Sequence, residues 1–253
     1  MKRKILLAIV ILGLGFIYAD SAMAYTANGD LSDWGVNPGT SDWVPNPGVF
    51  YTEEDLVGPG GQVYPGWGGQ TFDAEALYLD WDDTNLYLAL VTGFPNTGVG
   101  SYSAGDIAID FGANGTYEYG IEIGGHGSGY GGYSGTLGHV YKGITWQTSA
   151  SWGGVSNPLY MSSATTDAGI AGFAYNNSFY SSLDPNYNHW VVEMSIPKSF
   201  FNGDWNNYMR VHWTQNCGND NINLTTPVPE PMSLSLLGLS LLGMIGAGIK
   251  RKK

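Results

Sequence analysis

The sequence predicts an all-β fold in the form of a single antiparallel β-sandwich, with a jelly-roll-like architecture and Gly-rich loops. The chain of 253 residues contains 38 Gly, 17 Tyr and 9 Trp, a composition typical of loop-rich β proteins. Apolar residues alternate with polar ones over several short segments, and no stretch of residues 25–227 keeps a helical period for ten residues. These roughly 200 residues are enough for one sizeable domain.

Short apolar segments bounded by turn-forming residues define the expected elements. The two predicted hairpins join residues 76–81 to 86–91 through the turn 82–85, and residues 106–111 to 116–123 through the Gly-rich turn 112–115. Later elements are strands at 190–196 and 208–214 and one helical turn at 197–201. We expect the Gly-rich tracts 59–69 and 124–135 to be solvated loops.

The first 24 residues have the pattern of a secretory signal peptide. The basic residues at 2–4 precede an apolar run over residues 5–19, and Ala22 and Ala24 supply the small side chains that a signal peptidase requires. We expect cleavage after Ala24, so that the mature chain starts at Tyr25. An uncleaved membrane anchor is the alternative.

The C-terminal segment, residues 228–253, combines three features. Residues 232–249 form an 18-residue run without a charge, and a helix of that length spans the hydrocarbon core of about 30 Å. The basic residues 250–253 follow directly and favour the cytoplasmic side. Pro229, Glu230 and Pro231 precede the run, and two prolines so close together predict an extended segment at the membrane surface.

This order of Pro-Glu-Pro, apolar helix and basic tail resembles the PEP-CTERM sorting signal of Gram-negative bacteria, which is also called the ice-binding protein C-terminal domain. The resemblance implies recognition by an exosortase, a membrane protease-transpeptidase, followed by removal of the tail. It also implies transient membrane anchoring and delivery to the cell surface or the extracellular matrix. A plain single-pass anchor is the alternative.

The charge of the body excludes two classes of partner. The whole chain has a formal charge of −12, but seven of its ten Lys and Arg lie at residues 2–4 and 250–253. Residues 25–227 hold 20 acids and three bases, a formal charge of −17. We therefore expect no binding to nucleic acid or to anionic lipid headgroups.

Three motifs of the body resemble the family 9 carbohydrate-binding module and the related DOMON-like sandwiches. They are the G-D-x-x-D-W stretch ending at Trp34, the D-x-x-N-L-Y-L pair within residues 77–88, and the W-x-x-E-x-x-I-P strand at residues 190–197. The resemblance implies a β-sandwich with carbohydrate as a candidate ligand.

Three Trp residues are candidate sugar-binding side chains, because flat aromatic faces stack on sugar rings. Trp67 and Trp152 each precede paired Gly, which would leave their faces exposed, and Trp146 lies outside the clear inward positions. Trp34 and Trp43 lie outside those positions too, but we expect them to plug the ends of the sandwich.

The turn of the first predicted hairpin is a candidate calcium site. Asp80, Asp82, Asp83 and Asn85 gather oxygen ligands of the kind that calcium prefers. The spacing is not that of an EF-hand, since no Glu closes the loop. Solvated turn carboxylates without an ion are the alternative.

Signals for catalysis are weak. The four His show no H-E-x-x-H spacing and no G-x-S-x-G is present, although Glu118 and Glu122 could form a glycoside hydrolase pair. Cys217 is the one cysteine, and we expect it to be buried, free or in an intermolecular disulfide.

The sequence thus favours an exported, non-enzymatic cell-surface or exopolysaccharide-matrix protein with carbohydrate as the candidate ligand. Signal peptidase and exosortase are its expected partners during export. The alternatives are an extracellular polysaccharide-modifying enzyme and a structural coat protein without a small ligand.

Overall fold

The computed structural model describes residues 25–36, 43–124, 133, 135–149, 152–180, 188–201, 203–205 and 208–228. Antiparallel strands dominate this part of the chain, so the all-β prediction is confirmed. The elements are β1 (Phe50–Glu53), η1 (Gly69–Phe72), β2 (Ala74–Trp81), β3 (Asn85–Thr92), β4 (Asp106–Phe111), β5 (Tyr119–Glu122), β6 (His139–Lys142), β7 (Thr145–Gln147), β8 (Tyr160–Ser163), β9 (Thr166–Ile170), β10 (Gly172–Tyr180), β11 (Asn188–Pro197), η2 (Lys198–Phe201), β12 (Tyr208–Thr214) and β13 (Asn221–Pro227).

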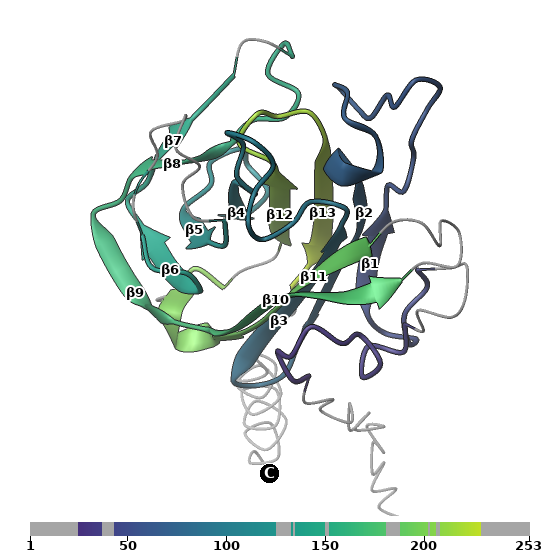
Figure 1. Ribbon diagram of the computed structural model, residues 1–253. Helices are drawn as coiled ribbons and strands as arrows, with labels where there is room; N and C mark the ends of the chain where they lie inside the picture. Colours follow the sequence, from purple (N-terminus) through teal and green to yellow (C-terminus); the bar gives the residue numbers. More distant parts are fainter. Residues whose placement is uncertain are drawn as a thin grey trace, which may run out of the picture.

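Two large sheets enclose one hydrophobic core (Figure 1). The five-stranded sheet has the order β1-β2-β3-β11-β10, and the six-stranded sheet has the order β13-β12-β4-β5-β6-β9. The short pair β7-β8 forms a third sheet. Strands β1 and β13, far apart in the sequence, are edge strands that contact each other across the two large sheets.

Alternation along the strands divides the apolar residues between two faces. On β2 and β3, Leu77, Leu79, Leu88 and Leu90 point into the core between the sheets, where Ile107 and its neighbours on β4 meet them. The structure contains both predicted hairpins and the predicted strands at residues 190–196 and 208–214, because their apolar residues follow the period of two of a strand. The predicted helical turn after Pro197 is present as well.

The five-stranded sheet is covered on its outer face as well. The intervening residues of β2 and β3, among them Tyr78 and Tyr87, form a second apolar cluster with Trp34 and Trp43 from the N-terminal segment. Both Trp are buried, as expected, but they cover this outer face and do not plug the ends of the sheets. The ring of Trp34 stacks on that of Tyr25 at 4.0 Å between centroids.

The second hairpin differs from its predicted length, because β5 begins at Tyr119 and not at residue 116. The carboxylate of Asp110 accepts hydrogen bonds from the backbone N–H groups of Asn114 (3.1 Å) and Gly115 (2.7 Å). The Asn114 side chain in turn accepts one from the N–H of Thr116 at 2.8 Å. These side-chain bonds satisfy backbone donors that a longer strand would have used.

The two terminal predictions fall outside the described residues. The signal peptide with Ala22 and Ala24, the motif Pro229-Glu230-Pro231 and the apolar run 232–249 all lie in residues 1–24 and 229–253. In the part of the chain that the structure describes, no helix has the length and apolar character needed to cross a membrane.

Candidate functional site

A groove of about 440 Å³ lies beside Trp152, one of the three candidate aromatic residues. We call it the Trp152 groove. Polar and aromatic side chains from three separate loops line it together with Leu159, Tyr160 and Cys217: they are Tyr102, Gln147, Thr148, Ser149, Trp152, Asn216 and Asn219. No Asp or Glu is among these lining residues.

One polar atom of a residue that lines the groove lacks a partner. Asn216 is only 3% exposed, and its side-chain Oδ1 is buried with no hydrogen-bond donor in reach among the described residues. A buried carbonyl oxygen without a donor is unfavourable by about 1–3 kcal/mol.

Trp67 is held beside the same turn. Its ring is 53% exposed, and the side chain of Asn219 donates a hydrogen bond to its backbone carbonyl. Gly66 packs so closely that a Cβ there would lie 3.0 Å from the ring of Trp152, and its N–H donates to the carbonyl of Asn219 at 2.6 Å. The residues 217–219 therefore bring Trp67 and Trp152 into one region.

Trp146 is placed differently. Its indole Nε1 donates to the carbonyl of Tyr117 at 3.0 Å, and its ring lies over Gly120, where a Cβ would be 2.9 Å away. Trp146 is partly buried and packs on the strand β5, so its geometry is that of a packing residue.

The candidate calcium ligands of the first hairpin are occupied by hydrogen bonds. Asp82 Oδ1 accepts from the N–H groups of Thr84 (2.6 Å) and Asn85 (2.7 Å), and its Oδ2 accepts from the hydroxyl of Tyr87 at 2.7 Å. Partial burial opposes ionisation of Asp82, but these bonds outweigh it and lower its pKa to about 2. Asp80 Oδ2 accepts from the hydroxyl of Tyr25 at 2.5 Å, whereas Asp83 is exposed at the tip.

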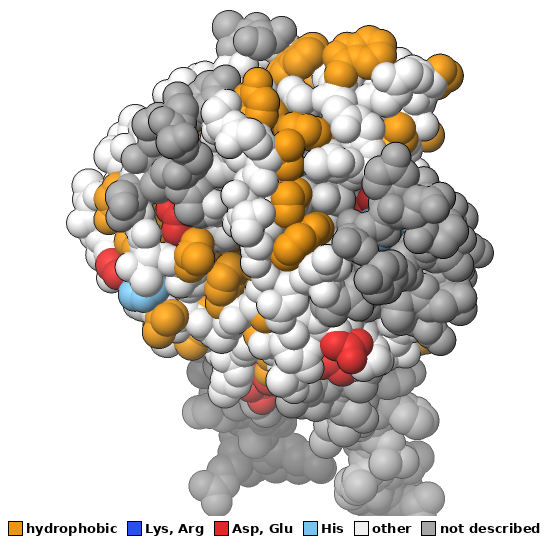
Figure 2. Space-filling model, viewed as in Figure 1, with side chains coloured by type: hydrophobic (Ala, Val, Ile, Leu, Met, Phe, Trp, Pro, Cys, Tyr) orange, Lys and Arg blue, Asp and Glu red, His pale blue; other side chains and the backbone are white. Residues whose placement is uncertain are grey.

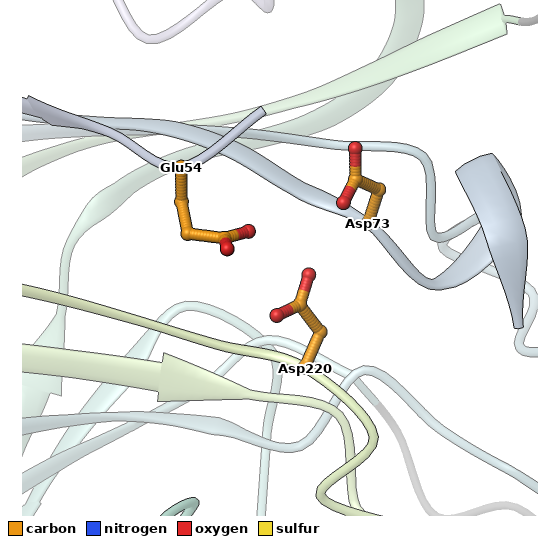
Figure 3. A group of neighbouring side chains, drawn as sticks. All are labelled: Glu54, Asp73 and Asp220. Carbon is orange, nitrogen blue, oxygen red and sulfur yellow. The ribbon is translucent and has the colours of Figure 1, made fainter. Parts of the chain in front are cut away.

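A different acidic group is far more buried. Glu54 follows β1, Asp73 precedes β2 and Asp220 precedes β13, and one carboxylate oxygen from each lies within 4.8 Å of the others. Figure 3 shows the three carboxylates pointing toward one another. We call Glu54, Asp73 and Asp220 the interior acidic cluster.

A second set of acids, Asp55 and Glu75, adjoins the interior acidic cluster through Asp73. Fully buried Glu75 pairs with His189, with 3.0 Å between Oε1 and Nε2. The indole Nε1 of Trp43 donates to Oδ2 of Asp55 at 2.9 Å. Both acids of this set therefore have donors.

Burial and mutual repulsion raise the pKa values of the carboxyl groups in the interior acidic cluster. Burial is the largest cause, and neighbouring carboxylates add to it, so that the pKa of Glu54 rises to about 9 and that of Asp73 to about 8. The pKa of Asp220 rises only to about 6, since backbone N–H groups of Ala74 and Asn221 partly offset its burial. Four or more acids at one place need protons or a cation.

The bases of the described body lie elsewhere. Lys142 Nζ sits 4.8 Å from the ring centroid of Tyr119, Lys198 Nζ sits 4.3 Å from that of Trp205, and Arg210 Nε is bonded to Thr225. On the face in Figure 2, hydrophobic side chains form a stripe and no Lys or Arg of the described residues is visible.

The two candidate catalytic acids lie in different surroundings. Glu118 Oε2 accepts the N–H of Phe111 at 2.9 Å, while Glu122 is buried on β5 opposite Asp106 of β4. Cys217 is a free, partly buried thiol, and burial raises its pKa to about 11, so it is protonated at neutral pH.

Comparison with known proteins gives no relative: the chain matches no family model, no curated protein and no solved structure.

Sequence reasoning missed the interior acidic cluster. Its members are separated by 19 and 147 positions in the chain, and no local motif joins them. The available signal was the position of Asp73, directly before an apolar strand and after an aromatic residue, where a solvated acid is unusual.

Proposed function

We propose that this chain is an exported, non-enzymatic protein of the cell surface or exopolysaccharide matrix, and that it binds carbohydrate in the Trp152 groove. The observation that carries the proposal is that Trp152 and the amide-bearing residues Gln147, Asn216 and Asn219 line one groove. A jelly-roll-like β-sandwich is the proposed architecture of the body.

The chemistry of the groove suits a neutral sugar. An aromatic face packs on the apolar C–H face of a pyranose, and nearby amides and hydroxyls bond its hydroxyl groups. Gln147, Ser149 and Asn219 provide such groups around Trp152. A glycoside hydrolase with its active site in the groove would need two carboxyl groups at the bond to be cleaved. The Trp152 groove is not lined by Asp or Glu, and neither is a second groove, which Asn28, Asn96 and Phe173 help to line.

We expect Trp152→Ala to weaken binding to the host's own exopolysaccharide at least about tenfold, equivalent to about 1.4 kcal/mol, because the stacking surface is lost. Affinity electrophoresis of the purified chain through gels containing the polysaccharide measures this. Tyr208→Ala is the matched control, since Tyr208 is an exposed aromatic residue, 52% accessible, that does not line the groove. Equal retardation of the Trp152 variant and the wild type contradicts the proposed site.

Export and sorting are proposed from the two ends of the chain. The apolar run after basic residues 2–4 would direct secretion, and Pro229-Glu230-Pro231 before the apolar run 232–249 would direct exosortase processing.

We expect Glu230→Ala to block removal of the C-terminal segment, so that the chain accumulates at its longer length in the membrane fraction of its host. Intact mass measurement of the protein from membrane and extracellular fractions reads this out. Thr226→Ala, close in sequence but outside the motif, is expected to be processed normally. Normal processing of the Glu230 variant would reject exosortase recognition of the motif.

A further inference from the structure

We propose that Glu54, Asp73 and Asp220 bind one divalent cation, Ca²⁺ being the best fit, at the edge where the two large sheets meet. This inference does not depend on the carbohydrate proposal, and it places the ion away from the hairpin turn of Asp82.

The spacing of the carboxylates is compatible with one calcium ion. Calcium binds oxygen at about 2.3–2.6 Å, so two of its ligands on opposite sides of the ion are up to about 5 Å apart. The three oxygens of the interior acidic cluster lie within 4.8 Å of one another. Calcium also accepts a mixture of carboxylate and further oxygen ligands without ideal geometry.

Asp73 supplies the observation that points to a ligand. It is completely buried, and neither of its two side-chain oxygens has a hydrogen-bond donor among the described residues. Glu54 Oε2 is buried and without a donor in the same way. Both side chains point into the space between the three acids (Figure 3). An ionised carboxylate buried there without a donor would cost several kcal/mol, so the group takes up either a proton or a cation.

Asp220 is prepared for this role by its backbone. Its Oδ2 accepts the N–H of Ala74 at 2.7 Å and its Oδ1 accepts the N–H of Asn221 at 2.8 Å. Its own N–H donates to Gln215 Oε1 at 3.1 Å, and Gln215 is tied to the carbonyl of Phe72 at 2.8 Å. The carboxylate is therefore fixed in position, and each oxygen keeps a lone pair for an ion.

The neighbouring acids are less suited to hold the ion. Glu75 faces His189 and the amide of Gln70, and Asp55 faces the indole of Trp43, so each already has a donor. No Lys or Arg of the described residues is seen to neutralise the interior acidic cluster, because Lys142, Lys198 and Arg210 contact other groups. Besides protonation of the carboxyl groups themselves, a divalent cation is the remaining source of positive charge at the cluster.

An ion at this place would join three parts of the fold. Glu54 directly follows the edge strand β1, Asp73 directly precedes β2, and Asp220 directly precedes the edge strand β13 of the opposite sheet. Asp220 is also adjacent to Asn219, which lines the Trp152 groove and holds Trp67. Cation binding would thus fix the two sheet edges together and order one wall of the groove.

The test uses terbium, which replaces calcium and emits when a nearby indole is excited. Trp43 is bonded to Asp55, beside Asp73, so the site has its own sensitiser. We expect the purified full-length chain, stripped with EDTA in mild detergent, to give saturable terbium emission that calcium displaces. We also expect saturating Ca²⁺ to raise the melting midpoint by about 5–10 °C. Absence of both effects in the wild type overturns the proposal.

Two variants locate the ion. Asp73→Asn is expected to abolish the emission and the calcium-dependent rise in melting midpoint, while its midpoint in EDTA is no lower than that of the wild type, because a repelling carboxyl group is gone. Asp83→Asn, in the exposed hairpin turn, is expected to keep both calcium effects. Loss of emission in the Asp83 variant with retention in the Asp73 variant would place the ion at the hairpin and overturn the proposal. Glu54→Gln gives the same comparison where Asp73→Asn does not fold.

Discussion

Replacing Glu193 with Ala is expected to lower the free energy of unfolding by about 3–5 kcal/mol. Glu193 lies on β11 and is 1% exposed. Its Oε1 accepts the indole Nε1 of Trp34 at 2.7 Å, and its Oε2 accepts the N–H of Gly29 at 2.6 Å. The same Oε2 lies 3.1 Å from the N–H groups of Asn28 and Asp30.

The size of the effect follows from the number of donors that lose their acceptor. Burial raises the pKa of Glu193, and the hydrogen bonds from Trp34, Asn28 and Gly29 partly offset this rise because they stabilise the ionised carboxylate. Without it, the N-terminal segment that covers the outer face of the five-stranded sheet loses its attachment, and Trp34 keeps a buried N–H without a partner.

Urea denaturation of the wild type and the variant measures this loss as a lower midpoint. Glu53→Ala is the matched control, because Glu53 is an exposed acid at the end of the edge strand β1. Its stability is expected to stay within about 0.5 kcal/mol of the wild type. A Glu193 variant that is no less stable than this control would show that the N-terminal segment is held by other contacts.

The same bonds connect two of the motifs on which the carbohydrate-module resemblance was based. Trp34 ends the first motif and Glu193 belongs to the third, and the two side chains are in direct contact despite a separation of 159 residues. Sequence reasoning identified both pieces but gave no reason for their types. The structure explains these residue types. The buried carboxylate of Glu193 needs hydrogen-bond donors, and the N–H groups of the N-terminal segment need an acceptor.

Elements with local determinants could be predicted from the sequence. The hairpin of β2 and β3 combines alternating apolar residues with an Asp-Asp-Thr-Asn turn, and the turn is stabilised within itself by Asp82. Strands such as β9 and β13 were missed because they hold few large apolar residues: Ile170 is the one in β9, and Ile222 and Leu224 are the two in β13. Their pairing partners β6 and β12 determine them through tertiary contacts.

The candidate metal site shows the same division. The sequence predicted a calcium site at Asp80, Asp82 and Asp83 because these acids lie close together in the chain. Turn carboxylates of this kind usually accept hydrogen bonds from the backbone N–H groups of their own turn. Asp82 does so with both Thr84 and Asn85. The interior acidic cluster depends on the packing of β1 against β13, which no local pattern contains.

A second buried acidic pair makes stability depend on pH. Asp106 on β4 lies opposite Glu122 on β5, both are 1% exposed, and Asp106 Oδ2 accepts the N–H of Met161 at 2.7 Å. Burial, with the adjacent Glu122 carboxylate as the next cause, raises the pKa of Asp106 well above its usual value. The folded state therefore binds a proton that the unfolded chain releases near pH 4.

The sign of the pH dependence follows directly. A raised folded-state pKa contributes stability that is complete below about pH 4 and is lost as the pH rises through the folded-state pKa of Asp106. We expect Asp106→Asn to be more stable than the wild type by roughly 1–3 kcal/mol at pH 8, because an amide at this position carries no charge and can donate to Glu122. Its Oδ1 keeps the bond from Met161.

Urea denaturation at pH 4 to 9 with excess Ca²⁺ separates this effect from that of the interior acidic cluster, because a bound ion would remove the protons of the cluster over the whole range. The difference between Asp106→Asn and the wild type is expected to grow with pH. Asp204→Asn, an acid outside both buried groups that accepts a bond from the Tyr119 hydroxyl, is the control and should show no such growth. If the free energy of unfolding of Asp106→Asn and of the wild type changed with pH in parallel, Asp106 would be ionised in the folded protein. The N–H of Met161 would then be a donor that stabilises its charge.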